Sequence, residues 1–365
     1  MILFVLSEVN RSDQLFSIVE KISFTKNKFI IIYMGLETDD LYQKLTLLHH
    51  AEIRIVNQSH SKKFQIALAL VRFLIEFRPS VVLSSGRLAS LFSMLVAKLF
   101  FIRKRIFIRH HTKLTSGLVP IRAKWVDRLT NYSCTDIVAV SPLVARLLTS
   151  AENVPARKVH VIPNGIDMDR FQLLAQTANT KLDCQHTFKV GSIGRHNEEK
   201  GIDVIEAAIH TLIANQANIC WTHVYGNTTK KQEDFSPLNC TPHRRMNFIS
   251  GIEHVEDFFS SLSAFIHVPT RPDSESFGLV YVEAIAMGVP SFFTRTGILV
   301  ENSLLQDFYI EVAYDSPLDL VNKLQLFITE QTLRSVESTH KQKAFRLEYS
   351  LDTMVNRYMT LLESR

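Results

Sequence analysis

Short apolar runs rich in β-branched and aromatic residues alternate along the chain with stretches whose apolar residues recur at helical spacing. In the first half the strand-like runs include ILFVLSE, KFIIIYMG, SVVLSSG and RIFIRHH, and the helix-like stretches include KFQIALALVRFLIEF. Apolar strands separated by amphipathic helices are typical of βαβ units, in which helices cover both faces of a parallel sheet. The alternation therefore predicts an α/β fold.

The same alternation restarts at FKVGSIGR, after the polar stretch FQLLAQTANTKLDCQHT. A chain of 365 residues also exceeds what one hydrophobic core usually serves. We therefore predict two α/β domains, residues 1–172 and 173–340, followed by a helical segment over residues 341–365. Open parallel sheets bind ligands outside the carboxyl ends of their strands, so two such sheets predict a cleft between the domains.

The charge of the chain is unevenly distributed. Residues 1–172 carry 24 Lys and Arg against 13 Asp and Glu, a net +11, and the remainder carries a net −6. The first domain is therefore expected to face an anionic partner, and Arg103 to Arg105 after the apolar stretch Leu88 to Ile102 would suit an anionic membrane. The alternative for that stretch is an ordinary helix covering a sheet. Nucleic acid is not expected, because the basic loops lack interleaved aromatic residues.

Features of targeting and redox state favour the cytoplasm, at the inner face of the membrane. The sequence MILFVLSEVN lacks the basic region of a signal peptide, and the longest apolar stretch falls short of the ~20 residues of a spanning helix. Four cysteines are scattered without CxxC spacing, which indicates neither a zinc site nor a disulfide framework. They are Cys134, Cys184, Cys220 and Cys240.

Two carboxylates stand eight residues apart in the stretch SESFGLVYVEAIAMGVP. The stretch predicts a helix after the strand-like run AFIHVPT, with Glu275 in the preceding loop and Glu283 within the helix. Backbone N–H groups around Phe277, Gly278 and Leu279 would form an anion site at the helix N-terminus. For either Glu alone an ordinary helix charge is the alternative, but an acid on an apolar helix requires a partner. Carboxylates beside a phosphate site suit a nucleotide sugar.

The stretch GSIGRHNEEKG places Gly194 and Arg195 at the end of a strand, and Lys200 at the start of the next helix. Arg and Lys are the two side chains that bind a diphosphate, and a strand end ahead of a helix N-terminus is where one binds. The alternative is a solvated loop in which Glu198 and Glu199 pair with both cations. A dinucleotide or ATP loop is not indicated, because neither GxGxxG nor a Walker A motif is present.

Two adjacent histidines, His110 and His111, follow the strand-like run RIFIR. Neighbouring residues in a strand point to opposite faces, so at most one of the two is expected to face the cleft. The pair Asp167 and Asp169 could suggest a metal, but it follows the turn signal Pro-Asn-Gly, and we interpret it as part of a turn.

Taken together, VIPNGIDMDRF, GRHNEEKG and ESFGLVYVEAIAMGVP, in this order and separation, resemble the retaining glycosyltransferases of the GT-B fold. The family is that of bacterial lipopolysaccharide, mannosyl and sucrose-phosphate transferases, known as glycosyl transferases group 1. The resemblance runs from Ser80 to about Gly297 and is strongest in the C-terminal half. It implies two Rossmann-like domains, with the acceptor on the first and the nucleotide sugar on the second, and a last helix that crosses back onto the first domain.

The resemblance also implies a donor site. Arg195 and Lys200, with Gly194 beside them, would bind the donor diphosphate, and Glu283 would bind the ribose hydroxyls. The amides of Phe277 to Leu279 would hold the sugar and the phosphate.

The catalytic residues that the resemblance implies are Glu275, in contact with the donor sugar, and His110, with His111 as the alternative, beside the transferring sugar. Reaction would occur on one face of the sugar, and the leaving phosphate would take the proton of the acceptor. No metal and no cofactor are expected, and the substrate would be a UDP- or GDP-sugar.

The function predicted is that of a retaining, metal-independent hexosyltransferase that extends a cell-envelope glycan or a lipid-linked acceptor. One departure from the family pattern concerns the loop after the first strand, which has no glycine before Gly35. The alternatives are therefore a non-catalytic GT-B subunit that binds a sugar nucleotide or a partner, and a GT-B nucleotide-sugar epimerase.

Overall fold

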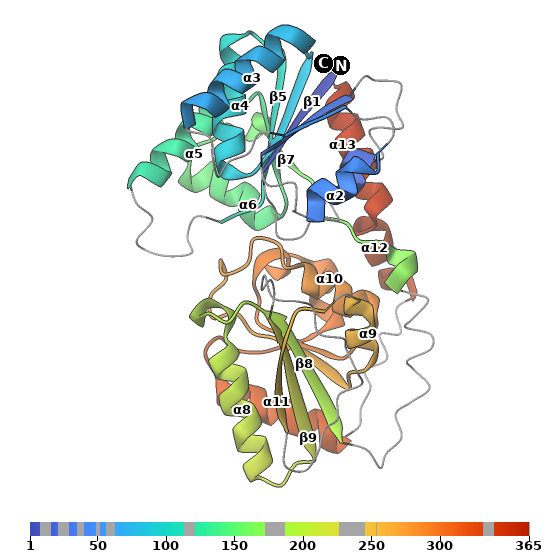
Figure 1. Cartoon of the computed structure of the whole chain (residues 1–365). Coiled ribbons are helices and arrows are strands. Elements are labelled where there is room, and N and C mark those ends of the chain that lie inside the picture. Colours follow the sequence, from blue (N-terminus) through green and yellow to red (C-terminus); the bar gives the residue numbers. More distant parts are fainter. Residues whose placement is uncertain are drawn as a thin grey trace. The chain divides into compact units, whose positions relative to one another are not determined.

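The computed structural model forms two compact units, each built around a parallel β-sheet (Figure 1). The first unit comprises Met1–Gly165 and Leu351–Arg365, and the second comprises Ile166–Ser350. The structure describes residues 1–7, 16–20, 29–34, 40–48, 52–55, 63–112, 121–171, 187–225, 245–252, 254–330 and 339–364. The α/β fold with two parallel sheets is thus confirmed.

The sheet of the first unit has seven parallel strands in the order β3-β2-β1-β4-β5-β6-β7. The order reverses next to β1, which pairs with both β2 and β4. The strands are short apolar runs, and most of their residues are buried, as expected for a sheet covered on both faces. Their bounds are β1 (Ile2–Ser7), β2 (Phe29–Met34), β3 (Glu52–Ile55), β4 (Val81–Ser85), β5 (Lys104–Arg109), β6 (Asp136–Ala139) and β7 (Val159–Val161).

Helices connect these strands, and α4 packs against β1, β4 and β5 with α3 and α5 on either side of it (Figure 1). The final helix, α13, belongs to this unit although it follows the second unit in the sequence. The described helices are α2 (Asp40–Thr46), α3 (Lys63–Phe77), α4 (Arg87–Leu99), α5 (Ile121–Ser133), α6 (Pro142–Arg146) and α13 (Leu351–Glu363), with helical turns at Leu147–Ala151 and Ala156–Lys158.

The sheet of the second unit has six parallel strands in the order β10-β9-β8-β11-β12-β13. Its strands are β8 (Phe188–Gly194), β9 (Ile219–Tyr225), β10 (Met246–Ser250), β11 (Ala264–His267), β12 (Ser291–Phe293) and β13 (Ile310–Glu311). Its helices are α8 (Ile202–Ala214), α9 (Val255–Ser260), α10 (Leu279–Ala286), α11 (Pro317–Glu330) and α12 (Thr339–Glu348), with short turns at Glu198–Lys200, Gly297–Leu299 and Ser303–Phe308.

A hydrophobic core joins α8 and α11 to one face of this sheet. Trp221 on β9 is fully buried in it, and its indole Nε1 donates a hydrogen bond to Ser192 Oγ at 2.9 Å. Phe327 on α11 packs edge-on against Phe188 and Phe292 from two different strands. The core holds β8 and β11 rigidly side by side, and these two strands carry the candidate site.

The division into units lies between Gly165 and Ile166, whereas we placed the domain boundary after residue 172. The polar stretch that suggested this boundary falls largely on residues 172–186, which lie outside the described residues. The segment 341–365 contains most of α12, which belongs to the second unit, and α13, which belongs to the first.

The apolar stretch from Leu88 to Ile102 forms most of α4, which packs on the sheet with Ala89, Met94 and Ala97 buried. It is therefore the sheet-covering helix that we gave as the alternative. Among the described residues, no helix has both the length and the apolar character needed to cross a membrane.

Two cysteines lie in the described part of the chain. Cys134 is a free thiol, and burial raises its pKa to about 12. Cys220 is disulfide-bonded, which the scattered spacing of the cysteines did not predict.

Candidate functional site

The candidate site lies at the carboxyl ends of β8 and β11, which are neighbours in the second sheet. β8 ends at Gly194 and leads through a turn to Lys200, and β11 ends at His267 and leads through a loop to Glu275. The Lys200 Nζ contacts Glu275 Oε1, although the two residues are 75 positions apart in the sequence. The fold therefore brings together one residue from each of the two predicted phosphate and sugar motifs.

Gly201 allows the two loops to approach this closely. Its φ is +65°, in the left-handed region, and a Cβ atom at this position would lie 2.0 Å from the backbone oxygen of Val268. A second link joins the loops, because the Thr270 N–H donates to the Glu199 carbonyl at 3.1 Å. Only glycine fits between the turn before α8 and the end of β11.

Glu275 is the acceptor at the centre of the site. His267 Nε2 lies 2.8 Å from Glu275 Oε1, and Lys200 contacts the same oxygen. Burial alone would raise the pKa of Glu275, but the hydrogen bond from His267 and the charge of Lys200 lower it to about 2. The carboxylate is therefore ionised at physiological pH, with Oε1 occupied by two donors.

His267 is buried, with 3% of its surface exposed, and its ring packs edge-on against Tyr281 at 5.1 Å between centroids. Burial lowers the pKa of His267, although Glu275 acts in the opposite direction. The Ile193 backbone also acts to raise this pKa, and the ring contacts the Glu275 carboxylate through Nε2. We did not single out His267 from the sequence, although a polar residue in the buried strand AFIHV was the available signal.

Arg195 and Gly194 lie at the end of β8. Gly194 is half-buried, and a Cβ atom there would lie 3.8 Å from the Lys200 side chain. Arg195 is exposed and forms no ion pair with any described residue. The alternative in which Glu198 and Glu199 neutralise both cations is wrong, because Lys200 pairs with Glu275 and no described acid pairs with Arg195.

The N-terminus of α10 lies after Glu275 in the same loop. The helix begins at Leu279, and no described side chain caps its first turn, so its leading N–H groups point out of the helix end. Gly278 has a φ of +83°, and a Cβ atom there would lie 2.3 Å from the Tyr281 ring. Phe277 is buried beside the helix start. This glycine is thus needed for local packing as well as for access to the amides.

Glu283 lies on α10 and is buried, with 6% of its surface exposed. Among the described residues it forms no hydrogen bond with Lys200, His267 or Glu275. The structure thus places the two acids of the motif in different surroundings, as their positions in loop and helix indicated.

His110 and His111 lie in the first unit, after β5, and are not part of the cluster on the second unit. Arg109 before them is fully buried, pairs with Glu152 at 3.0 Å and Asp127 at 3.5 Å, and donates to the His111 carbonyl. The His111 ring lies 3.9 Å from Asp127 and so belongs to this ion-pair cluster. Burial, with a contribution from His111, lowers the pKa of His110 to about 4.

Asp167 accepts hydrogen bonds from the backbone N–H groups of Asp169 and Arg170, both at 3.1 Å. Asp167 thus caps the helical segment 168–171, in which Asp169 lies, so the pair is structural but belongs to a helix start rather than to the turn that we expected. The glycine-free loop after β1 falls on residues 8–15, outside the described residues.

Two family profiles match the chain in tandem. Glycosyltransferase family 4 matches residues 28–170, and glycosyl transferases group 1 matches residues 177–343. Among curated proteins, the O-antigen biosynthesis glycosyltransferase WclY of Escherichia coli is 29% identical over 157 residues, 40% of each chain. An uncharacterized glycosyltransferase of Methanocaldococcus jannaschii is 31% identical over 217 residues, 59% of this chain and 55% of that protein. The chain thus matches about half the length of these relatives.

Solved structures of the GT-B type match the whole chain. HepE of Anabaena in complex with UDP-glucose superposes with a TM-score of 0.77 at 15% identity, over all of both chains. Sucrose-phosphate synthase of Thermosynechococcus elongatus gives 0.73 at 14% identity, over 99% of this chain and 98% of that one. UDP-GlcNAc 2-epimerase of Neisseria meningitidis gives 0.62 at 14% identity, over all of both chains.

Proposed function

The chain belongs to the group 1 glycosyltransferases and has the GT-B fold, and from this premise we propose that it transfers a hexose from a nucleoside-diphosphate sugar to a cell-envelope acceptor. The proposed donor is a UDP- or GDP-sugar, and the UDP-glucose complex of HepE, which shares the fold, supports UDP. The O-antigen role in the name of the Escherichia coli relative supports a glycan or lipid-linked acceptor. We propose that the reaction retains the configuration of the sugar and requires no metal.

The observation that carries the proposal is the cluster of Lys200, His267 and Glu275 beside the N-terminus of α10. It combines a cation, an ionised carboxylate and free helix amides at the carboxyl ends of neighbouring parallel strands, where α/β sheets bind ligands. A diphosphate has the charge for the cation and the amides, and a sugar has hydroxyls for the carboxylate. A nucleotide sugar has both.

Transfer would break the bond between the sugar and the diphosphate, so negative charge would develop on the leaving group. Arg195, Lys200 and the amides of Phe277 to Leu279 would stabilise that charge more in the transition state than in the ground state. Glu283, one turn inside α10, would bind the ribose hydroxyls of the nucleotide. Exposed and unpaired among the described residues, Arg195 is available for the ligand.

Glu275 would orient the donor sugar. Its Oε1 accepts from both His267 and Lys200, which withdraws electron density from the carboxylate and makes it a poor nucleophile. An ionised, immobilised carboxylate is well suited to accept a hydrogen bond from a sugar hydroxyl. This supports a reaction on one face of the sugar, in which the leaving phosphate takes the proton of the acceptor hydroxyl.

His110 completes the proposed machinery as the histidine beside the transferring sugar. Its lowered pKa keeps the ring neutral at pH 7, so that it can exchange hydrogen bonds with hydroxyls without adding a second cation. The place of action that we propose is the cytoplasm, at the inner face of the membrane, and the net +11 of residues 1–172 supports contact with anionic lipid.

Calorimetric titration with UDP, GDP and ADP, with and without EDTA, tests the donor site in wild type and in Arg195→Ala. Lys189→Ala is the matched control, because Lys189 lies at the opposite end of the same strand, β8. We expect one nucleotide to bind with micromolar affinity that EDTA does not change, and only Arg195→Ala to weaken it. If none of the three binds, the donor site is wrong and a non-catalytic subunit replaces the proposal.

Once the nucleotide is known, Glu275→Gln separates binding from turnover. We expect this variant to keep most of the nucleotide affinity and to lose transfer, since the amide has no charge with which to hold the sugar. Unaltered transfer would remove Glu275 from the site. Release of an epimerised nucleotide sugar by the wild type would favour the epimerase.

A further inference from the structure

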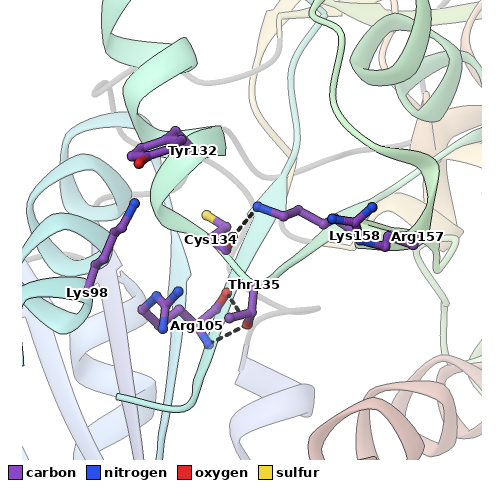
Figure 2. A pocket seen from close by; sticks show the side chains of 7 residues that line it. All are labelled: Lys98, Arg105, Tyr132, Cys134, Thr135, Arg157 and Lys158. Atoms are coloured by element: carbon purple, nitrogen blue, oxygen red, sulfur yellow. Dashed lines mark hydrogen bonds between the residues drawn. The ribbon is translucent and has the colours of Figure 1, made fainter. Parts of the chain in front are cut away.

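A basic pocket of about 490 Å³ lies in the first unit, at the amino-terminal edge of its sheet (Figure 2). Arg105 lies near the start of β5, Thr135 precedes β6, Lys158 precedes β7, and Lys98 comes from the end of α4. The basic pocket is lined by Lys98, Arg105, Tyr132, Cys134, Thr135, Arg157 and Lys158. It therefore opens at the opposite sheet edge from the carboxyl strand ends, where α/β sheets bind substrates.

Three of the four cations of the basic pocket contact carbonyl oxygens or an aromatic ring rather than a carboxylate of the described residues. Arg105 Nε donates to the Ser133 carbonyl at 2.7 Å, Lys158 donates to the Cys134 carbonyl at 2.9 Å, and Lys98 lies 3.2 Å from the centre of the Tyr132 ring. In the part of the chain that the structure describes, none of these cations, nor Arg157, forms an ion pair with a carboxylate. Four positive charges thus lie around the pocket, and Asp136 acts on Arg105 through its charge without forming an ion pair with it.

The electrostatics of the pocket show the same imbalance. Burial lowers the pKa of Lys158, and the charges of Arg105, Lys98 and Arg157 lower it further, against an opposing effect of Cys134. The nearby Asp136 is engaged by His160, at 2.9 Å. A bound anion would relieve the repulsion among the cations, which makes the site complementary to a phosphate group.

Apolar side chains project beside the pocket. The turn that connects Lys98 to Arg105 exposes Leu99 by 74%, Phe100 by 39% and Phe101 by 88%. Phe101 has a φ of +56°, which a bulky residue seldom adopts. The three side chains of this turn are exposed and so do not pack in the core of the unit. Their clustering between two pocket cations indicates that they contact a partner.

One face of α5 also exposes apolar side chains, and its end lies beside Lys98. Trp125, Leu129 and Tyr132 lie four and three residues apart, which places them on one side of the helix, and they are exposed by 62%, 43% and 69%. Tyr132 lines the pocket, and Figure 2 shows it facing Lys98. We call Leu99, Phe101, Trp125, Leu129 and Tyr132 the apolar rim.

We propose that the basic pocket and the apolar rim together form a membrane-docking face, in which the pocket takes the headgroup phosphate of an anionic phospholipid and the rim enters the interfacial layer. Trp and Tyr side chains favour this layer, and each Lys or Arg near an anionic surface contributes about 1 kcal/mol. The inference deepens the membrane contact of the proposed function, but it does not depend on the donor site.

The apolar rim favours a lipid over a soluble phosphate or a nucleic acid. A free phosphate would need the four cations but not the exposed Phe101 and Leu99. A nucleic acid would need a stripe of cations with stacking aromatics among them, whereas here the apolar side chains surround one compact pocket. An amphipathic face with cations around apolar side chains is what an anionic bilayer binds.

Flotation of the full chain with vesicles tests the docking face. We expect binding to vesicles of phosphatidylcholine mixed with phosphatidylglycerol, weaker at high salt, and little binding to phosphatidylcholine alone. The double variant Lys98→Glu with Arg157→Glu should bind at least roughly thirtyfold more weakly, since the loss of two cations alone corresponds to that factor and the two added acids repel an anionic surface. Phe101→Ser should also weaken binding. In both variants UDP affinity should stay unchanged, which separates a failure here from a failure of the donor site.

The matched controls are exposed residues of the second unit, Lys343→Glu and Leu318→Ser, which should float like the wild type. Tryptophan emission identifies the face directly, because Trp125 should shift to the blue with vesicles and Trp221 is already buried. Flotation without this shift, or flotation that the pocket variants leave unchanged, would overturn the proposal. Tight binding of inorganic phosphate or single-stranded RNA in the absence of flotation would also overturn it, in favour of that ligand.

Discussion

Replacing Glu275 with Gln is expected to lower the free energy of unfolding of the second unit by an amount that shrinks as the pH falls. The folded protein holds the pKa of Glu275 at about 2, against an ordinary value of 4.5, because His267 and Lys200 stabilise the ionised form. A carboxyl whose pKa is lower in the folded state stabilises the fold above its unfolded pKa. It loses this contribution as the pH falls toward the folded pKa.

The magnitude follows from the shift. A difference of 2.5 pKa units corresponds to about 3 kcal/mol at pH 7. By the same linkage about 1 kcal/mol of it is lost by pH 4, and more by pH 3.5. Because Gln does not titrate, the difference in unfolding free energy between wild type and Glu275→Gln should shrink by these amounts.

Urea unfolding followed by the fluorescence of Trp221 measures this difference, since Trp221 is fully buried in the core of the second unit. The sequence has one other tryptophan, Trp125 in the first unit, so the measurement is made in a Trp125→Phe background. Glu311→Gln, at a carboxylate whose side chain is 55% exposed, is the control and should show a small difference that does not vary with pH. If the difference in free energy of unfolding between wild type and Glu275→Gln stays constant from pH 7 to pH 3.5, the reasoning is refuted.

Three further outcomes follow from the structure. Gly201→Ala should lower the free energy of unfolding, measured by Trp221 fluorescence, by more than about 2 kcal/mol. Gly288→Ala is the control, because Gly288 has a φ of +67° but no atom within 4 Å of the added Cβ, and it should cost about 1 kcal/mol. Equal losses in the two variants would contradict the steric argument. Arg109→Met leaves two buried carboxylates without their cation and should cost about 3–5 kcal/mol, measured by circular dichroism. Burial lowers the pKa of His110 to about 4. A plot of the transfer rate against pH should therefore show no step near pH 6.5, the ordinary pKa of histidine, and the His110→Asn variant should not change the profile there.

The alternation of strands and helices could be predicted because both faces of a parallel sheet are buried. AFIHVPT and KVGSIG therefore consist mostly of apolar or small residues, and both form strands in the structure. The same logic placed Lys200 and Glu275 in the segments that lead from such strands to the next helices. Their contact could not be predicted, because it depends on β8 and β11 being neighbours in the sheet.

The partner of Lys200 shows what local sequence cannot specify. Glu198 and Glu199 are its nearest acids along the chain, but the loops pair across the sheet edge, and Glu275 reaches the ammonium instead. The basic pocket could not be predicted from the sequence for a similar reason. Lys98 and Arg105 are joined by one turn, but Lys158 follows only after α5 and β6, so no spacing rule relates it to them. In the sequence, the net charge of residues 1–172 and the basic run Arg103 to Arg105 indicated an anionic partner.

The placement of α13 has a consequence for the order in which the protein is completed during translation. Synthesis proceeds from the N-terminus, so Met1–Gly165 leaves the ribosome long before α13 is made. The apolar surface that this helix covers stays exposed meanwhile, whereas the second unit is one continuous segment and can close its core earlier. The side chains that seal the first unit last are Met354, Val355, Tyr358, Leu361 and Leu362. Until α13 has been made, the part of the nascent chain most exposed to aggregation is therefore the part that was made first.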